Sequence, residues 1–261
     1  MVVKRSFPDI DSLIRRGFVC VDMHVHTHHS LDCSTKVEDI KKLCSKKGFF
    51  VAITDHNSIN GVLEAKKINM AFVPGIEVTS LEGAHVLFYF SRISDLKKFF
   101  DNEIKHCLIN PMRTSISNFR LFEISKKYDC IVSAAHPFGS GNCGLYKLKK
   151  HFDPVFVEGI NASISAEKNS GALNLSDKKF TAGSDAHIID YVGRSLTCIK
   201  SDSLKDFLFN LQNDDFLIIG VEIGFLLKLK VNFFKELSLW KSMKTKDLIK
   251  NRLKQVGLMI K

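Results

Sequence analysis

Residues 18–29 read FVCVDMHVHTHH, an apolar run that passes directly into a run of histidines. The apolar part has the length and the β-branched content of a buried strand. Side chains alternate between the two faces of a strand, so His24 and His26 point to the same face. Two imidazoles at this spacing can bind a single metal ion. We expect the next two histidines, His28 and His29, to be solvated loop residues.

Further along the chain, apolar runs alternate with helical patterns. Eight candidate strands cover residues 18–26, 49–54, 71–78, 85–90, 130–135, 155–160, 179–183 and 195–199. This alternation predicts repeated βα units on a parallel sheet, and the continuous apolar runs are typical of strands buried on both faces. A capping-box pattern predicts a helix after Thr35, and an apolar stripe predicts another over residues 95–109.

Most of these strands are followed by residues that can bind metal. The residues concerned are Asp55, His56, Glu77, His136, Asp185 and His187. The carboxyl ends of the strands form the active-site face of a parallel α/β barrel. His85 is the exception, because it begins its strand. Each motif alone is more simply explained as a buried, hydrogen-bonded His or a helix-capping Asp. Their repetition at one edge of the sheet favours a shared site.

The ordered blocks resemble the PHP family, the polymerase and histidinol phosphatase superfamily of metal-dependent phosphoesterases. The resemblance runs from about residue 19 to about residue 200, through HxH at 24–26, TDH at 54–56, GIE at 75–77, HP at 136–137 and SDAH at 184–187. It implies an α/β fold, a distorted (β/α)7 TIM-like barrel. We expect this barrel to occupy residues 1–220, with residues 221–261 as a basic, helical C-terminal extension.

The resemblance also implies a three-metal site made of nine side chains. One metal would be held by His24, His26 and Asp185, a second by His85 and His136, and a third by Asp32, His56 and His187, with Glu77 bridging the first two. Catalytic roles would fall to His24, His26, Glu77, His136, Asp185 and His187. Family members have His or Asp at the position of Asp32, and the Gly that follows there is replaced by Cys33 in this chain.

The chemistry of these ligands is consistent with such a site. Six imidazoles and three carboxylates, with no thiolate, suit Zn²⁺, Mn²⁺ or Fe²⁺ rather than an iron–sulfur cluster, so we expect two or three of these ions as cofactors. They would offset the charge of a phosphate ester and lower the pKa of water from 15.7 toward about 7. The hydroxide so activated would attack phosphorus. The sequence therefore predicts an enzyme that hydrolyses phosphate esters.

Other polar residues are candidates for supporting roles. Asp22 and Asp55 lie beside ligands and would either accept the second N–H of a metal-bound His or bond backbone amides. Arg194 and Arg113 are candidate phosphate-binding residues, since a guanidinium can bind phosphate through two hydrogen bonds. Two further polar residues are Glu158, inside the predicted strand over 155–160, and Asn161, directly after it. Asn161 is a candidate pocket residue, and Glu158 is read equally as a cap or an ion-pair partner.

Composition sets limits on the class of protein. With 261 residues, 45% of them hydrophobic and 25% charged, the chain is neither collagen-like nor mostly disordered. Seven scattered cysteines without a CxxC pair suggest reduced thiols in an intracellular protein. The N-terminal residues lack the apolar run of an export signal, and no stretch has the length of an apolar membrane span. We therefore expect a cytoplasmic protein.

The formal charge of +10 is concentrated near the C-terminus. Residues 226–261 carry a net +8, with apolar residues at helical spacing between the lysines. This pattern is explained by amphipathic helices packed on the barrel or on another subunit, a solvated lysine face, nucleic-acid binding, or contact with anionic lipid. The expected substrate is a small phosphorylated metabolite or a nucleotide. The alternatives are an exonuclease on short RNA or DNA and a non-catalytic nucleic-acid-binding subunit on the same barrel.

Overall fold

The computed structural model describes residues 1–139, 144, 154–213 and 215–242. Its main feature is one curled sheet of ten strands. In spatial order they are β1 (Val2–Lys4), β12 (Phe216–Gly220), β11 (Ser195–Lys200), β2 (Phe18–Val25), β3 (Phe50–Ile53), β4 (Val73–Thr79), β5 (His85–Tyr89), β8 (Ile131–Ala134), β9 (Phe156–Asn161) and β10 (Lys179–Gly183). A separate two-stranded sheet pairs β6 (Leu108–Asn110) with β7 (Arg113–Thr114).

The curl of the sheet brings the end of β10 back to β2. The amide of His26 donates to the carbonyl of Ala186 at 3.1 Å, and the amide of Asp185 donates to the carbonyl of His24 at 2.8 Å. This closure confirms the predicted α/β fold, a distorted TIM-like barrel.

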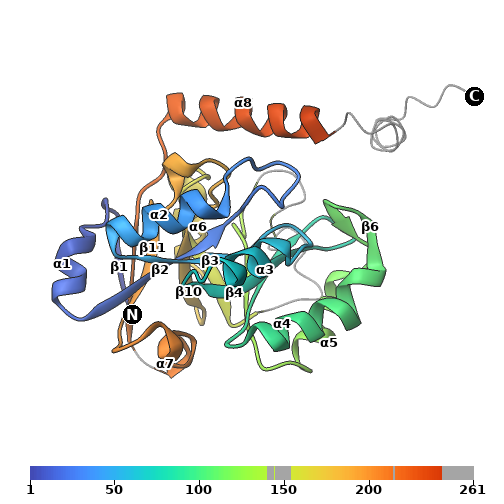
Figure 1. Cartoon of the computed structure of the whole chain (residues 1–261). Helices are drawn as coiled ribbons and strands as arrows, with labels where there is room; N and C mark the ends of the chain where they lie inside the picture. Colours follow the sequence, from blue (N-terminus) through green and yellow to red (C-terminus); the bar gives the residue numbers. More distant parts are fainter. Residues whose placement is uncertain (140–143, 145–153, 214, 243–261) are drawn as a thin grey trace, which may run out of the picture.

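Helices lie around the sheet (Figure 1). They are α1 (Ile10–Arg15), α2 (Val37–Lys47), α3 (Asn60–Lys67), α4 (Ile93–Phe99), α5 (Asn118–Ser125), α6 (Ala166–Leu173), α7 (Phe207–Asn213) and α8 (Phe225–Ser242). The last of these, α8, runs across one end of the molecule, above α2 and α6 in the view of Figure 1. No helix of the described residues is both long enough and apolar enough to cross a membrane.

All eight predicted strands are present, but two strands of the main sheet were not predicted. β1 is only three residues long, and β12 lies in an apolar stretch that carries no polar marker at its end. The predicted helix over 95–109 is wrong beyond residue 99. There α4 passes into one π-helical turn, Phe100–Ile104, and one 3-10 turn, Lys105–Cys107. The apolar stripe is still buried at Leu96, Phe99 and Ile104, because the π turn shifts the register of the helix.

The prediction of a parallel sheet is wrong for several pairs. β5 runs antiparallel to both β4 and β8, and β11 runs antiparallel to both β2 and β12. The reversal of β5 places its first residue, His85, opposite Thr79 at the end of β4. His85 therefore reaches the edge where the neighbouring parallel strands end, although it begins its own strand.

The prediction that all cysteines are reduced is wrong for one pair. Cys20 on β2 and Cys198 on β11 are direct partners in the antiparallel ladder and form a disulfide. Residues that face each other in such a ladder are close enough for their sulfur atoms to meet. The spacing of the cysteines in the sequence does not reveal this pairing. Four of the described cysteines are free, and Cys143 lies outside the described residues.

Phe99 joins α4 to the sheet. Its buried ring lies 4.8 Å from the ring of Phe88, and 5.3 Å from the rings of both Phe90 and Tyr128, measured between centroids. We expect Phe99→Ala to lower the free energy of unfolding by about 3–5 kcal/mol, since it leaves a cavity in the core. Phe209→Ala, on a side chain that is 68% exposed, should cost under about 0.5 kcal/mol. Urea unfolding measures both, and equal midpoint shifts would contradict this packing.

Candidate metal centre

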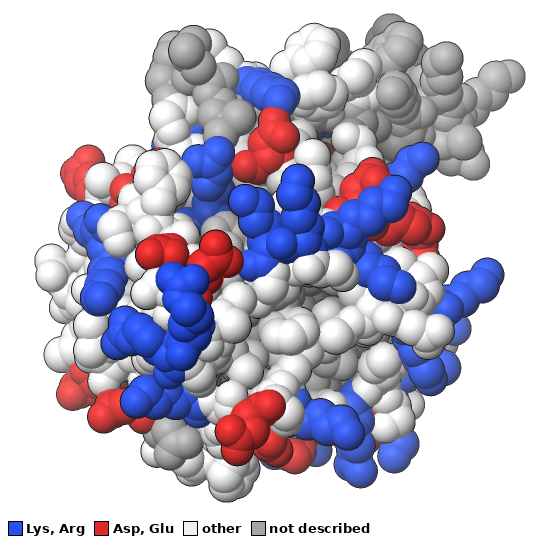
Figure 2. All heavy atoms as spheres, turned by 60° about the vertical axis from the view of Figure 1, so that its left-hand side comes forward, with Lys and Arg blue, Asp and Glu red and all other residues white. Residues whose placement is uncertain are grey.

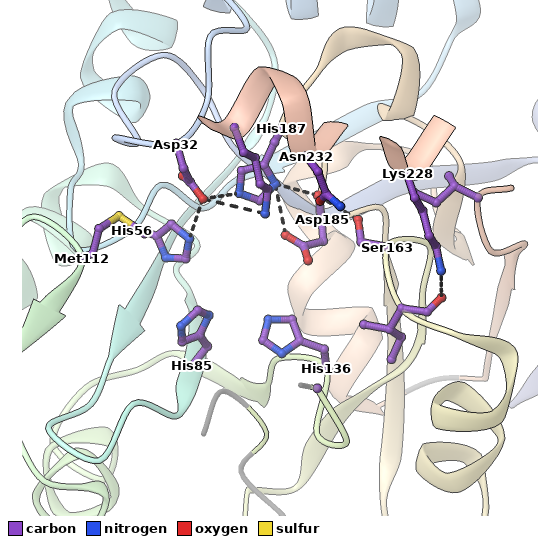
Figure 3. A pocket seen from close by; sticks show the side chains of 14 residues that line it. Asp32, His56, His85, Met112, His136, Ser163, Asp185, His187, Lys228 and Asn232 are labelled. Carbon is purple, nitrogen blue, oxygen red and sulfur yellow. Dashed lines mark hydrogen bonds and ion pairs between the residues drawn. The ribbon is translucent and has the colours of Figure 1, made fainter. Parts of the chain in front are cut away.

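The nine side chains predicted to bind metal converge at one end of the sheet. Figure 3 shows those that line the cavity, which are Asp32, His56, His85, His136, Asp185 and His187. The nine side chains come from the ends of β2, β3, β8 and β10, from β4 and β5, and from the loop between β2 and α2. All are buried except His85, whose side chain is 15% exposed. The structure thus brings together His24, His26, Asp32, His56, Glu77, His85, His136, Asp185 and His187.

Glu77 lies at the middle of this group. Its Oε2 atom is 3.4 Å from the Nε2 atoms of both His24 and His26, and 2.9 Å from Nδ1 of His56. Its other oxygen, Oε1, is 2.9 Å from Nδ1 of His85. The two oxygens of one carboxylate therefore face different sets of imidazoles, which is the arrangement needed to bridge two cations.

Two further carboxylates complete the group. Oδ1 of Asp185 is 3.4 Å from Nε2 of His26. Oδ2 of Asp32 is 2.9 Å from Nε2 of His187 and 3.8 Å from Nε2 of His56. The fifth imidazole around Glu77, that of His136, has its Nε2 atom 3.6 Å from Oε1. Imidazole and carboxylate thus alternate through the whole centre.

The hydrogen bonds behind two of these rings fix their orientation. Nδ1 of His24 is 3.0 Å from Oε1 of Glu158, and Nδ1 of His26 is 3.1 Å from Oγ of Ser30, which itself donates to Asp55. Because acceptors take both Nδ1 protons, the Nε2 atoms are left with lone pairs. These two Nε2 atoms lie 3.1 Å apart, so both lone pairs face the same space.

Five buried polar atoms of the centre lack a well-formed hydrogen bond among the described residues: Oδ1 of Asp32, Nδ1 of His56, Oε2 of Glu77, Nδ1 of His136 and Nε2 of His187. Three of them still make close contacts without hydrogen-bond geometry, since Nδ1 of His56 is 2.9 Å from Oε2 of Glu77 and Nε2 of His187 is 2.9 Å from Oδ2 of Asp32. A buried polar atom that nothing satisfies costs about 1–3 kcal/mol, so this group requires an explanation. Ligand atoms within 4.8 Å of one another group as His24, His26 and Asp185, as His26, His56 and His187, and as His56, Glu77 and His85. Imidazole and carboxylate donors in this arrangement fit divalent transition metals.

The local electrostatics keep the carboxylates ionised. Burial opposes ionisation of Glu77, Asp32 and Asp185, but neighbouring imidazoles hold the pKa of each carboxyl well below its usual range. Burial, followed by the neighbouring His187, lowers the pKa of His26 well below its usual value, whereas, against the effect of burial, neighbouring carboxylates raise the pKa values of His24, His56 and His136. A cation that binds these imidazoles would therefore displace protons from them.

Two of the nine residues have strained backbones. His136 has φ of 28° and Asp185 has φ of 54°, a left-handed conformation that costs a residue with a side chain about 1–3 kcal/mol. Beside Asp185, a Cβ atom on Gly183 would lie 2.4 Å from Cβ of His24. Only glycine allows β10 and β2 to approach this closely, and the approach is what places Asp185 beside His24.

Asp22 and Asp55 bond backbone amides, one of the two roles considered for them. Asp22 accepts from the amides of Ser184 and Gly193, each at 2.8 Å, and burial raises its pKa to about 7 against the effect of these hydrogen bonds. Asp55 accepts from the amide of Thr27 at 2.6 Å. Neither carboxylate contacts a ligand ring, and both instead hold the loops that carry the ligands.

Glu158 is the partner of His24 that the sequence did not identify. Besides the ring of His24, it accepts from the amide of His136 at 2.7 Å and from Nδ2 of Asn161 at 2.9 Å. Asn161, a candidate pocket residue, is fully buried and bonds Glu158 instead. The only signal in the sequence was an acidic residue inside an apolar strand, VEGIN at 157–161.

We expect Glu158→Gln to lower metal affinity by about 10–100-fold, because an amide is a weaker acceptor for the Nδ1 proton of His24. Metal titration calorimetry measures the change, and thermal unfolding of the metal-free protein checks that the variant folds. Glu38→Gln, on the exposed face of α2, is the control and should leave the affinity unchanged. An unchanged metal affinity in Glu158→Gln would show that Glu158 does not position His24 for metal binding.

The two predicted phosphate-binding arginines lie elsewhere. Nε of Arg194 donates to the carbonyl of Asp190 at 3.2 Å, and its guanidinium lies 5.4 Å from the ring centroid of Phe7. Arg113 donates to the carbonyl of Leu81 at 3.2 Å. Neither arginine is among the described residues that line the cavity at the metal centre.

The cavity over the metal centre has a volume of about 430 Å³. Its lysines, Lys228 and Lys235, both belong to α8, as does Asn232, which also lines the cavity. Figure 3 shows Lys228 and Asn232. His28 and His29 lie outside the cavity, and their Nε2 atoms are 3.5 and 2.5 Å from Oε2 of Glu64. The two predicted loop histidines therefore lie beside a carboxylate at the surface, apart from the metal centre.

Comparison with known proteins places this arrangement in a family. The PHP domain profile matches residues 22–188, and the profile of a PHP-associated segment matches residues 171–215. An uncharacterised protein of Methanocaldococcus jannaschii is 40% identical over 77 residues, which span 24% of this chain and 45% of that relative. The chain thus matches less than half the length of this curated relative.

Two solved proteins share the fold at low sequence identity. The lesion-specific endonuclease Q of Pyrococcus furiosus aligns with a TM-score of 0.62 and 18% identity, over 77% of this chain and 57% of that one. Endonuclease Q in complex with a 27-mer duplex substrate that carries an abasic lesion aligns with the same TM-score. A two-domain Bacteroides vulgatus protein containing a predicted PHP-like metal-dependent phosphoesterase aligns with a TM-score of 0.52 and 18% identity, over 90% and 74% of the two chains.

The profile match covers more than half of the chain and contains all nine residues of the centre. From this match and the fold, the chain belongs to the PHP domain family.

Proposed function

We propose that this protein is a metal-dependent phosphoesterase that hydrolyses the phosphate ester of a small metabolite or nucleotide. The observation that carries the proposal is the convergence of nine His, Asp and Glu side chains at one end of the sheet, all buried except His85, with five of their polar atoms lacking a well-formed hydrogen bond among the described residues. Histidines with a purely structural role would have their ring nitrogens hydrogen-bonded to protein groups, whereas metal ligands keep ring nitrogens for a cation.

The proposed assignment uses all nine residues. One ion would bind His24, His26 and Asp185, a second His85 and His136, and a third Asp32, His56 and His187, with Glu77 shared by the first two. Divalent ions of this kind supply Lewis acidity, which lowers the pKa of water and offsets the charge of a phosphoryl group. Zn²⁺, Mn²⁺ and Fe²⁺ all suit the donors.

The protein itself orients the groups and shapes the space around them. Glu158 and Ser30 hold the rings of His24 and His26 with their Nε2 atoms toward Glu77 and Asp185. Asp22 and Asp55 hold the loops after β10 and β2. The cavity of about 430 Å³ lies within the range of small-molecule sites, which supports a metabolite or nucleotide over a long polymer.

A panel of substrates tests the proposal. The purified protein is supplemented with Zn²⁺, Mn²⁺ or Fe²⁺ and assayed on p-nitrophenyl phosphate, its bis ester, histidinol phosphate, nucleotides and labelled oligonucleotides. We expect hydrolysis of monoesters that a chelator removes and that metal restores. No hydrolysis of any ester with any of the three metals would contradict the proposal.

A nuclease is the second candidate, and two observations favour it. Endonuclease Q, which shares the fold, has been captured with duplex DNA, and residues 226–261 of this chain carry a net charge of +8. Figure 2 shows one face of the molecule on which Lys and Arg are interrupted by Asp and Glu, so this face lacks the concentrated charge of the C-terminal segment. Cleavage of oligonucleotides that is lost on deletion of residues 243–261 would favour the nuclease. Binding of oligonucleotides without hydrolysis of any ester would favour the non-catalytic subunit.

Two further expectations stay proposals. The barrel and the C-terminal extension would divide near residue 220, since β12 ends at Gly220 and α8 begins at Phe225; residues 243–261 lie outside the described residues. A cytoplasmic location stays a prediction, and the Cys20–Cys198 disulfide counts against its premise that all thiols are reduced.

A further inference from the structure

The helix α8 lies beside the metal centre and contributes a row of polar side chains to the cavity. Lys228, Asn232 and Lys235 line it, with spacings of four and three residues that place them on one helical face. Seven residues at a rise of about 1.5 Å separate the two lysines by roughly 10 Å along the helix. One helix thus brings two lysines to a cavity that is also lined by the imidazoles and carboxylates of the metal centre (Figure 3).

Contacts on both sides of this row hold α8 against the barrel. Phe234 packs against the hydrophobic core, and the ammonium of Lys230 pairs with the carboxylate of Asp190. Just before the helix, the amide of Ile223 donates to the carbonyl of Ala162 at 2.9 Å. The position of the lysines is therefore fixed by packing and by backbone hydrogen bonds, and not only by their own charges.

The surroundings of the two ammonium groups point to an anionic ligand. Nζ of Lys235 is 3.8 Å from Oδ2 of Asp32, and the same oxygen is 2.9 Å from Nε2 of His187. The negative charge of Asp32 is therefore shared between Lys235 and His187. Nζ of Lys228 donates to the carbonyl of Ile164 at 3.3 Å, a neutral acceptor that does not balance its charge. Lysine side chains are usually solvated, yet Lys235 is only 32% exposed.

We propose that Lys228 and Lys235 bind the phosphoryl oxygens of the substrate and make the enzyme selective for phosphate monoesters over diesters. This inference rests on the proposed phosphoesterase function. A monoester carries close to two negative charges near neutral pH, because its second pKa is about 6, and it leaves three oxygens free for metal and lysine. A diester carries one negative charge, and its second substituent occupies one of the oxygens that metal and lysine would otherwise bind.

The selectivity has a geometric part as well. Because α8 borders the cavity, we expect a phosphoryl group at the end of a molecule to reach the metal centre more readily than an internal phosphate, which carries a nucleotide on each side. This would give α8 a role at the active site that differs from tracking a nucleic-acid backbone.

Lysine-to-glutamine variants test this proposal, since they keep most of the side-chain length and remove the charge. We expect Lys228→Gln and Lys235→Gln each to lower kcat/KM for p-nitrophenyl phosphate by about 10-fold and the double variant by about 100-fold. The value for bis(p-nitrophenyl) phosphate should change less than about 3-fold. Lys230→Gln, on the same helix but outside the cavity, is the matched control. Its ion pair with Asp190 is exposed and contributes little to the position of α8 beside the packing of Phe234, so both values should stay within about 3-fold.

Binding of inorganic phosphate to the metal-loaded protein gives a second readout. By calorimetry, the Kd should rise about 100-fold in the double variant and stay unchanged in Lys230→Gln. Equal losses for monoester and diester, an unchanged phosphate Kd, or an equal effect of Lys230→Gln would overturn the role of the two lysines. If the wild-type protein binds phosphate through the lysines but hydrolyses neither ester, the proposed function fails and the binding site stands. If it hydrolyses the monoester equally well without the lysines, the function stands and this inference fails.

Discussion

Glu77→Gln is expected to reduce phosphoesterase activity by about 10³-fold or more while leaving the fold intact. Glu77 is almost fully buried, and its two oxygens face His24, His26 and His56 on one side and His85 on the other. Glutamine keeps the shape but replaces one charged oxygen by an NH₂ group, which cannot coordinate a cation. The amide can therefore serve at most one of the two proposed metal positions, and the bridge between them is lost.

The comparison needs a control and a check on folding. Glu38→Gln makes the same chemical change on the exposed face of α2 and should retain wild-type activity. Circular dichroism and thermal unfolding establish whether Glu77→Gln is folded before its activity is compared. A folded Glu77→Gln protein with more than about a tenth of wild-type activity would mean that the reaction does not depend on this carboxylate.

Removal of metal is expected to lower the free energy of unfolding of the wild-type protein by about 4 kcal/mol. The comparison is with protein in a solution whose free metal concentration is about a thousand times the Kd. The reason is that a cation binds the assembled centre and not the unfolded chain. Without it, five buried polar atoms of the centre lack a well-formed hydrogen bond among the described residues. Urea unfolding with chelator and with added metal measures the difference as a shift in midpoint.

The same experiment on Glu77→Gln separates specific from general effects of metal. With one shared ligand lost, the metal-dependent shift should shrink to less than half of the wild-type value. Overlapping unfolding curves with and without metal in the wild-type protein would show that the centre stabilises the fold through protein contacts alone.

The sequence predicted the strands and the ligands better than it predicted their surroundings. Alternation along a strand is a local property, so HVH at 24–26 could be read directly from the chain. The direction of a strand depends on its neighbours, and His85 became understandable only when β5 proved antiparallel to β4. The pairing of Cys20 with Cys198 has the same origin, because it joins neighbouring strands that are distant in sequence.

The residues around the ligands were harder to predict for a related reason. Glu158 meets His24 across a sequence separation of 134 residues, and no local pattern links them. The arginines were chosen for their chemistry and their place in the sequence, but Arg194 points toward Phe7 and away from the cavity. Lys228 and Lys235 belonged to a basic segment whose role depended on how α8 packs, which charge and periodicity do not determine.

Metal content is the most direct test of the central claim that these nine side chains hold a cluster of divalent cations. Inductively coupled plasma mass spectrometry, on protein exposed to Zn²⁺, Mn²⁺ or Fe²⁺ and then dialysed, gives the number of ions retained by each chain. The account predicts two or three ions in the wild-type protein and fewer in Glu77→Gln. Retention of no ion by the folded wild-type protein, under any of the three conditions, would contradict it.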